Sequence, residues 1–296
     1  METLGQILSP DFLLRNSVYT SVLVGLACPL VGVFLVMRRL AFMGVALPQI
    51  SSTGIAFALS CPIWIGFNPA GYSPQTAHML AFAGSIVFSL GAILTLAFME
   101  RRGRGHLEGR LGTAYVVAGA SSILLLAQNP YGEIGLLDLL KGEVIAVSNF
   151  DLGMTGAMLA LVLAVLGIFQ KELLLVSFDR DMALVLRKNV VSWDVLLYIL
   201  IGLTVSMAVL SVGPLISFGF LLIPALIAHL FARNMRQFTV FSSLIGGAAA
   251  FLGFYIAYRW DMPVGPTDVV LLGVVYAAAW TVMRLLYGGL QHSHQV

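Results

Sequence analysis

Residues 193–232 read WDVLLYILIGLTVSMAVLSVGPLISFGFLLIPALIAHLFA, a long apolar run that is interrupted only by SVGPLISFG at 211–219. About 20 residues cross the hydrocarbon core of a bilayer, so the run is long enough for two membrane spans. Gly213, Pro214 and Gly219 are expected to break a helix or to reverse the chain. Two interpretations are therefore open: two full spans joined by a turn, or one span followed by a re-entrant segment.

The composition of the whole chain is that of an integral membrane protein. Hydrophobic residues make up 59% of the 296 residues and charged residues only 10%, with a mean hydropathy of +0.95. Soluble domains carry roughly 25% charged residues. The first residues lack the basic and apolar regions of a cleavable signal, so the spans themselves are expected to direct insertion into membrane lipid. The net charge of +2 is too small to suggest nucleic acid as a partner.

Apolar length predicts an all-α polytopic membrane protein with a single transmembrane domain over 1–296. About nine spans are expected, or eight with a re-entrant segment. The longest connections are an outer segment at 129–151 and an inner segment at 170–192. The nine runs are 16–37, 40–66, 76–99, 111–128, 152–169, 193–212, 213–232, 237–258 and 266–287.

The positions of the basic residues predict the orientation. Short cytoplasmic loops are enriched in Lys and Arg. With nine spans and an outer N-terminus, 13 of the 16 basic residues fall on the inner side, and only Arg15, Lys141 and Arg259 fall outside. We therefore expect the N-terminus outside and the C-terminus inside. The 13 inner residues are Arg38, Arg39, Arg101, Arg102, Arg104, Arg110, Lys171, Arg180, Arg187, Lys188, Arg233, Arg236 and Arg284.

No feature of the chain predicts catalysis of its own. None of the three lysines lies in a G-x-x-x-x-G-K-[ST] phosphate-binding loop, so any nucleotide hydrolysis must come from another chain. The predicted spans hold no ionisable residue near their middle. This pattern argues against the two alternative functions, an intramembrane enzyme and a secondary transporter. No cofactor is expected.

The inner segment KELLLVSFDRDMALVLRKNVVSWD predicts a short cytoplasmic helix. Asp179 and Asp181 open it and Arg187 and Lys188 close it, which matches the helix dipole at both ends. We expect two to three turns. Such a helix lies on lipid headgroups or docks a cytoplasmic partner, and both interpretations are open. Its compact apolar face is formed by Met182, Ala183 and Leu186.

Five pieces of the sequence, taken in order, resemble the membrane permeases of bacterial ATP-binding-cassette importers for zinc and manganese. LVGVFLVMRRLAFMG is similar to the first span of that family, its double-arginine inner turn and the opening of its second span. KGEVIAVSNFDL is similar to an outer-loop motif, and KELLLVSFDRDMA to the cytoplasmic coupling segment. SVGPLISFGFLLIPALIAHL and DMPVGPTDVVLL match the pattern of the last three spans.

The resemblance implies a type II importer-like permease in a bacterial inner membrane. Two permease subunits, identical or sister chains, would enclose one path for zinc, manganese or iron, free or chelated. A cytoplasmic ATPase dimer would drive transport, and an extracytoplasmic metal-binding protein would deliver the cargo. The segment from Asp179 to Lys188 would be the coupling helix. Arg187 stands where the family usually has a glycine, so the end of this helix is expected to differ.

A second departure lies in the stretch FMGVALPQISSTG at 42–54. The family usually reads Gly-Asp-Ala-x-Ser-His here, which puts a carboxylate and an imidazole on one helical face as metal ligands. In this chain Val45 and Gln49 occupy those two positions, and Pro48 replaces the serine. Thr53 stands where the family often has proline. The metal-coordinating residues are therefore unknown.

Small and polar residues form one face of this second span, with Val45, Gln49, Ser52 and Thr53 on it. Such a face either packs against another span or lines the translocation pathway. We favour the pathway, because an amide about 14 Å into a span is costly unless it is paired or hydrated. His78 and Asp268, near the outer ends of their spans, are further candidates for the pathway. For His78 a hydrated side chain at the membrane interface is favoured, and for Asp268 capping of the helix N-terminus explains the position as well.

Overall fold

The computed structural model describes residues 12, 14–64, 74–101, 107–128 and 147–291, and every regular element in these ranges is a helix. Nine of the helices in the described ranges are long and apolar enough to cross a membrane, which confirms the nine-span prediction by length and composition. The helices are α2 (Arg15–Met37), α3 (Ala41–Trp64), α4 (Pro74–Arg101), α5 (Leu107–Ala127), α7 (Asn149–Ile168), α8 (Gln170–Phe178), α9 (Arg180–Val185), α10 (Val190–Val212), α11 (Pro214–Phe231), α12 (Met235–Trp260) and α13 (Val264–Gln291).

The turn between α10 and α11 divides the long apolar run into two full spans, as in the first of the two interpretations. Gly213 has a φ of 84°, a value that favours glycine, and Pro214 is the first residue of α11. The two residues therefore reverse the chain, and α10 and α11 are separate spans. The expectation that Gly219 also breaks a helix is wrong. Gly219 lies inside α11, where the absence of a side chain makes room for Val269 of α13.

Small residues bring the central spans into close contact. Gly25 of α2 meets Gly246 of α12 so closely that a Cβ on Gly25 would lie 2.7 Å from the Gly246 carbonyl oxygen. The Ser243 hydroxyl of α12 donates to the Leu26 carbonyl oxygen at 2.8 Å. Gly54 of α3 and Gly84 of α4 form a second close contact of the same kind. Close approach through glycine and hydroxyl groups is the usual way in which membrane helices associate.

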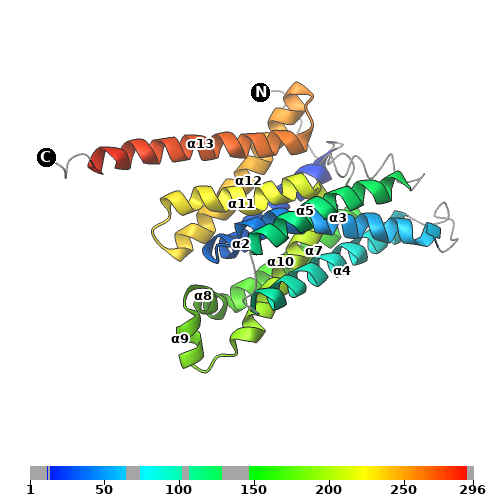
Figure 1. The fold of residues 1–296 in the computed structure, drawn as a ribbon. Helices are drawn as coiled ribbons and strands as arrows, with labels where there is room; N and C mark the ends of the chain where they lie inside the picture. The colour runs from blue at the N-terminus through cyan, green and yellow to red at the C-terminus, as the bar shows by residue number, and fades with distance from the viewer. Residues whose placement is uncertain (1–11, 13, 65–73, 102–106, 129–146, 292–296) are drawn as a thin grey trace.

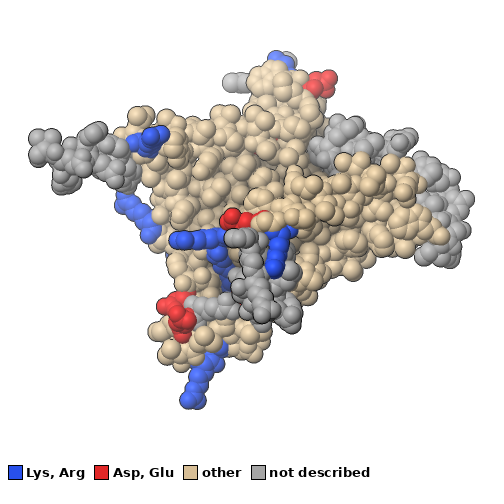
Figure 2. Space-filling model, in the orientation of Figure 1, with Lys and Arg blue, Asp and Glu red and all other residues tan. Residues whose placement is uncertain are grey.

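Two parts of the chain extend from the bundle (Figure 1). Helices α8 and α9 lie together at one end, and the C-terminal half of α13 runs beyond the neighbouring helices. The face shown in Figure 2 is mostly uncharged, and its Lys and Arg atoms lie in separate places, from the top of the view to the end that carries α8 and α9. The orientation of the chain in the membrane stays a prediction.

Candidate functional site

Helix α9 begins as the sequence predicts. The Asp179 carboxylate accepts a hydrogen bond from the backbone N–H of Met182 at 2.8 Å and so caps the helix N-terminus. The helix has six residues, which is shorter than the expected two to three turns. The chain reverses again before α10, whose N-terminus is capped by the side chain of Asn189.

The end of α9 keeps a geometry that normally selects glycine. Arg187 has a φ of 54°, in the left-handed region. Its N–H donates to the Leu184 carbonyl at 2.9 Å, and the N–H of Lys188 donates to the Ala183 carbonyl at 3.0 Å. These two bonds are the Schellman pattern of helix termination. Arg187 therefore ends α9 in a conformation that glycine adopts most readily. The expected difference from the helix end of the family stays a prediction.

The exposed apolar face of α9 differs in one residue from the predicted face. Ala183 is fully buried, where it packs with Val176 and Val190. It therefore contributes to the chain's own core and cannot reach a partner. Met182 and Leu186 are about half exposed, as expected for a docking surface. The other exposed apolar side chains of this region are Phe178, Leu184 and Val185.

Arg38, at the end of α2, connects this helix to α8 and α10 through its side chain. Its Nε donates to the Ser177 hydroxyl of α8 at 3.0 Å, and its Nη1 pairs with the Asp194 carboxylate of α10 at 2.8 Å. The guanidinium also lies 5.9 Å from the ring centre of Tyr198. Both charged side chains are about nine-tenths buried. We call this arrangement the Arg38 joint. Sequence reasoning counted Arg38 only as an inner charge and did not predict its partners.

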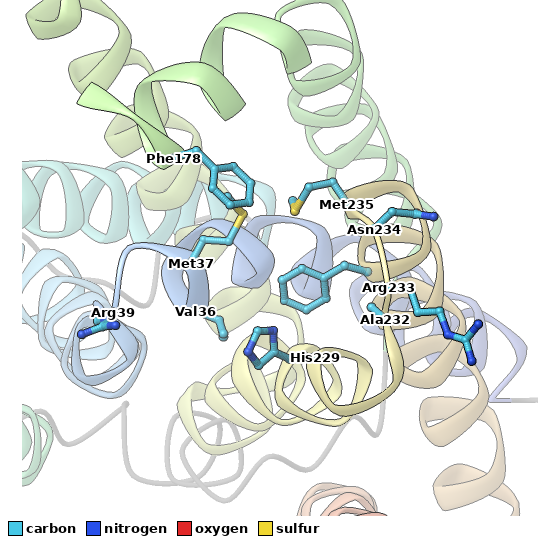
Figure 3. A pocket seen from close by; sticks show the side chains of 10 residues that line it. Val36, Met37, Arg39, Phe178, His229, Ala232, Arg233, Asn234 and Met235 are labelled. Atoms are coloured by element: carbon cyan, nitrogen blue, oxygen red, sulfur yellow. The ribbon is translucent and has the colours of Figure 1, made fainter. Parts of the chain in front are cut away.

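A pocket of about 520 Å³ lies beside the Arg38 joint (Figure 3). The His229 ring lies near its centre, while Arg39 and Arg233 lie at opposite edges. We call it the arginine-rimmed pocket. Its walls come from the end of α2, the end of α8 and the turn between α11 and α12. The lining residues are Val36, Met37, Arg39, Phe178, His229, Ala232, Arg233, Asn234, Met235 and Phe238.

The polar face of α3 packs against α5 within this single chain. The Thr53 hydroxyl lies 2.7 Å from the Ala118 carbonyl oxygen of α5 and 3.0 Å from the Gln49 carbonyl oxygen. The Gln49 amide approaches Gly119 of α5 so closely that a Cβ there would lie 3.2 Å from its nitrogen. Ser52 is buried, whereas Val45 and Gln49 are half-buried. These contacts correspond to the packing interpretation, and the pathway role remains a prediction.

A second set of hydroxyl groups links α3, α4 and α10 at the centre of the bundle. Ser51 pairs with Ser85, and the Ser206 hydroxyl donates to the Ser89 hydroxyl at 3.0 Å. The Ser89 hydroxyl in turn donates to the Ser85 carbonyl at 2.7 Å. All four side chains are buried. The sequence analysis did not predict this network, although Ser85 and Ser89 have the i, i+4 spacing of one helical face.

Ionisable residues at the other ends of the spans are not arranged as a metal site. His78 of α4 pairs with Asp151 of α7 at 3.3 Å, and Asp151 also completes the capping box of α7 with Ser148. Asp268 is fully buried against Gly253 of α12. Within the described ranges, no three His, Cys, Asp or Glu side chains form a group that could hold a metal ion. His106, His292 and His294 lie outside the described residues.

The described residues form a bundle of nine candidate spans with a short capped helix projecting at one end, which is the architecture of a multi-pass membrane protein. The chain belongs to the ABC 3 transport family, whose model matches residues 11–283. It is 27% identical to the manganese import system permease protein ScaB of Streptococcus gordonii over 267 residues, which cover 90% of each chain. It is 26% identical to the manganese transport system membrane protein MntC of Listeria monocytogenes, covering 90% of this chain and 89% of that one.

The fold also matches a solved structure. Superposition on a chain of PsaBC from Streptococcus pneumoniae, solved in complex with Fab, gives a TM-score of 0.78. The two chains are 25% identical, and the match covers 94% of each. The similarity covers almost the whole length of these chains, which confirms the family resemblance and the all-helical fold.

Proposed function

We propose that this chain is the membrane permease of an ATP-binding-cassette importer for a divalent metal ion, driven by a separate ATPase. The observation that carries the proposal is the end-to-end similarity to permeases named for manganese import, over 90% of the chain. Manganese is therefore the first cargo to test, with zinc, iron and chelated metal as alternatives. In this proposal two permease subunits, two ATPase subunits and an extracytoplasmic metal-binding protein assemble in a bacterial inner membrane.

Helices α8 and α9 form the coupling segment in this proposal. Met182 and Leu186 expose apolar surface where the segment projects from the bundle, and such surface favours a protein partner. The capped start at Asp179 and the Schellman end at Arg187 keep this short helix folded at the surface. Movement imposed on it by the ATPase would reach α2 and α10 through the Arg38 joint.

The cargo would cross without the Asp and His side chains usual in the second span. Val45 offers no donor atom, and Gln49 offers only a neutral amide. Neutral oxygen ligands bind a dehydrated zinc or manganese ion poorly. The ion is therefore proposed to pass hydrated, to arrive chelated, or to be held by a sister subunit. Val45, Gln49, Ser52 and Thr53 stay the proposed pathway residues, reached after α3 and α5 separate.

Charged substitutions on α9 test the coupling role. In the variant Met182→Asp with Leu186→Asp, two charges would have to be desolvated in the contact with the ATPase. We expect loss of ATPase copurification and of ATP-dependent manganese uptake into proteoliposomes. The matched control, Met182→Leu with Leu186→Met, keeps the face apolar and should retain both. Wild-type uptake and copurification by the Asp variant would refute the coupling role.

A further inference from the structure

The arginine-rimmed pocket has an apolar lining, most of which lies outside the proposed coupling segment and only Phe178 of which belongs to it. Met37, Met235 and Phe178 lie together on one side of the pocket, and Val36 lies beside the exposed ring of His229 (Figure 3). His229 stacks on Phe238 with ring centres 5.3 Å apart. Methionine and aromatic side chains form adaptable apolar surfaces that accept a partner's side chain. An apolar hollow of this size at a protein surface is typical of a binding site.

The walls of the pocket are held in place by hydrogen bonds. In the Arg38 joint, Nε of Arg38 donates a hydrogen bond to the Ser177 hydroxyl at 3.0 Å. Ser177 directly precedes Phe178, which lines the pocket. In the turn between α11 and α12, the side-chain oxygen Oδ1 of Asn234 accepts a hydrogen bond from the backbone N–H of Gln237 at 2.9 Å. The Gln237 side chain accepts from the N–H of Arg233 at 3.1 Å. The pocket is thus formed before any partner arrives, which lowers the entropic cost of binding.

The rim of the pocket is positively charged. Arg39 and Arg233 are exposed at opposite edges, and neither forms an ion pair with a described residue. None of the described lining residues is acidic. The N-terminus of α12 adds the positive end of a helix dipole at the same place. The ligand that complements this pocket carries an apolar group flanked by negative charges.

We propose that the arginine-rimmed pocket is a second docking site for the ATPase, which inserts an apolar side chain flanked by acidic residues. The inference rests on the function proposed above. Phe178 connects the two surfaces, because it lines the pocket, is 67% exposed and immediately precedes the cap of α9. An anionic lipid headgroup has similar chemistry. The pocket wall formed by α8 favours a protein, because α8 is not among the candidate membrane spans.

Binding of the separately purified ATPase to the permease in nanodiscs of zwitterionic lipid tests the pocket. Arg233→Glu places like charge against the acidic partner and is expected to weaken affinity about tenfold. Phe178→Ser removes an apolar wall and is expected to have a similar effect. The matched control is Arg236→Glu, an exposed arginine three residues along the chain that does not line the pocket. It should change affinity by less than about twofold.

A photoreactive residue at Met235, in an otherwise wild-type chain, tests the geometry without a change of charge. We expect crosslinks to the ATPase. Crosslinks to lipid alone, or equal affinities for Arg233→Glu and Arg236→Glu, would overturn the proposal. The Met182→Asp and Leu186→Asp variant, measured in parallel, separates the two proposals. If it binds with wild-type affinity, the coupling role fails; if it loses binding while both pocket variants bind normally, only the pocket is rejected.

Discussion

At the residue scale, the contact between Asp268 and Gly253 buries a carboxyl group without hydrogen-bond partners among the described residues. Asp268 is fully buried in α13, and neither carboxyl oxygen has a hydrogen-bond partner in the described part of the chain. The carboxyl group lies directly against Gly253 of α12, where even a Cβ would collide with it. A buried polar group without partners lowers stability. The close helix contact therefore forms despite this carboxyl group.

Substitution of Asp268 is expected to stabilise the protein. Asp268→Val removes the unpaired carboxyl group and should raise the free energy of unfolding by about 1–3 kcal/mol. Gly253→Ala, which adds a methyl group at the same contact, should lower the midpoint of thermal unfolding. Both are measured by thermal unfolding in detergent, with Gly273→Ala as the control, because a Cβ at Gly273 meets nothing within 4 Å. A less stable Asp268→Val variant would indicate that the carboxyl group has a partner outside the chain.

At the element scale, the Arg38 joint decides how α8 and α9 are attached to the bundle. Arg38 lies at the end of α2, directly before the turn that begins α3. Its partners Ser177 and Asp194 stand on either side of α9 in the chain. Ala183 of α9 also packs with Val176 of α8 and Val190 of α10 in a small buried cluster. The coupling segment is thus attached to the spans by the hydrogen bond from Arg38 to Ser177, by the Ala183 cluster and by Leu173 of α8, which is buried in the main core.

We expect variants of the Arg38 joint to separate ATP hydrolysis from transport. Arg38→Gln and Asp194→Asn each break the buried ion pair by removing one partner and should cost about 3–5 kcal/mol. Each should lower the metal transported per ATP hydrolysed, because α9 would move without α2. The double variant leaves no unpaired charge and should cost less than the sum of the two.

The transport-to-hydrolysis ratio distinguishes this role from simple support of the fold. If the joint were only structural, transport and hydrolysis would fall together with the amount of folded protein, and the ratio would stay at the wild-type value. Arg38→Lys is the informative control. Lysine keeps the charge but lacks the planar fork that reaches Ser177 and Asp194 together, so it should restore stability more than coupling.

At the scale of the whole molecule, the nine candidate spans of the described residues predict that successive connections lie on alternate sides of the membrane. Cysteines introduced at Gln75 and at Lys188, both exposed, should therefore label from opposite sides once Cys28 and Cys61 are replaced. In intact cells an impermeant reagent should modify Gln75→Cys, and Lys188→Cys only after the membrane is opened. Modification of both from outside would contradict the predicted orientation.

The sequence by itself determined the number and order of the spans and the start of α9. These properties depend on local features: the length of apolar runs, the Gly213 and Pro214 pair, and the side chain of Asp179. Gly219 was misjudged because its role depends on Val269, a residue far away in the chain, whose side chain it admits against α11. The sequence alone does not distinguish a glycine that ends a helix from one that lies within a helix and makes room for a neighbouring side chain.

Only the tertiary structure decided which face of each helix meets which neighbour. It turned Ala183 into the core, set Thr53 and Gln49 against α5, and joined Arg38 to Asp194 across 156 positions. Helical periodicity defines a face but carries no information about the helix that will cover it. In a membrane this ambiguity is greater than in water, because lipid and protein are equally apolar and small residues suit either packing or a pathway.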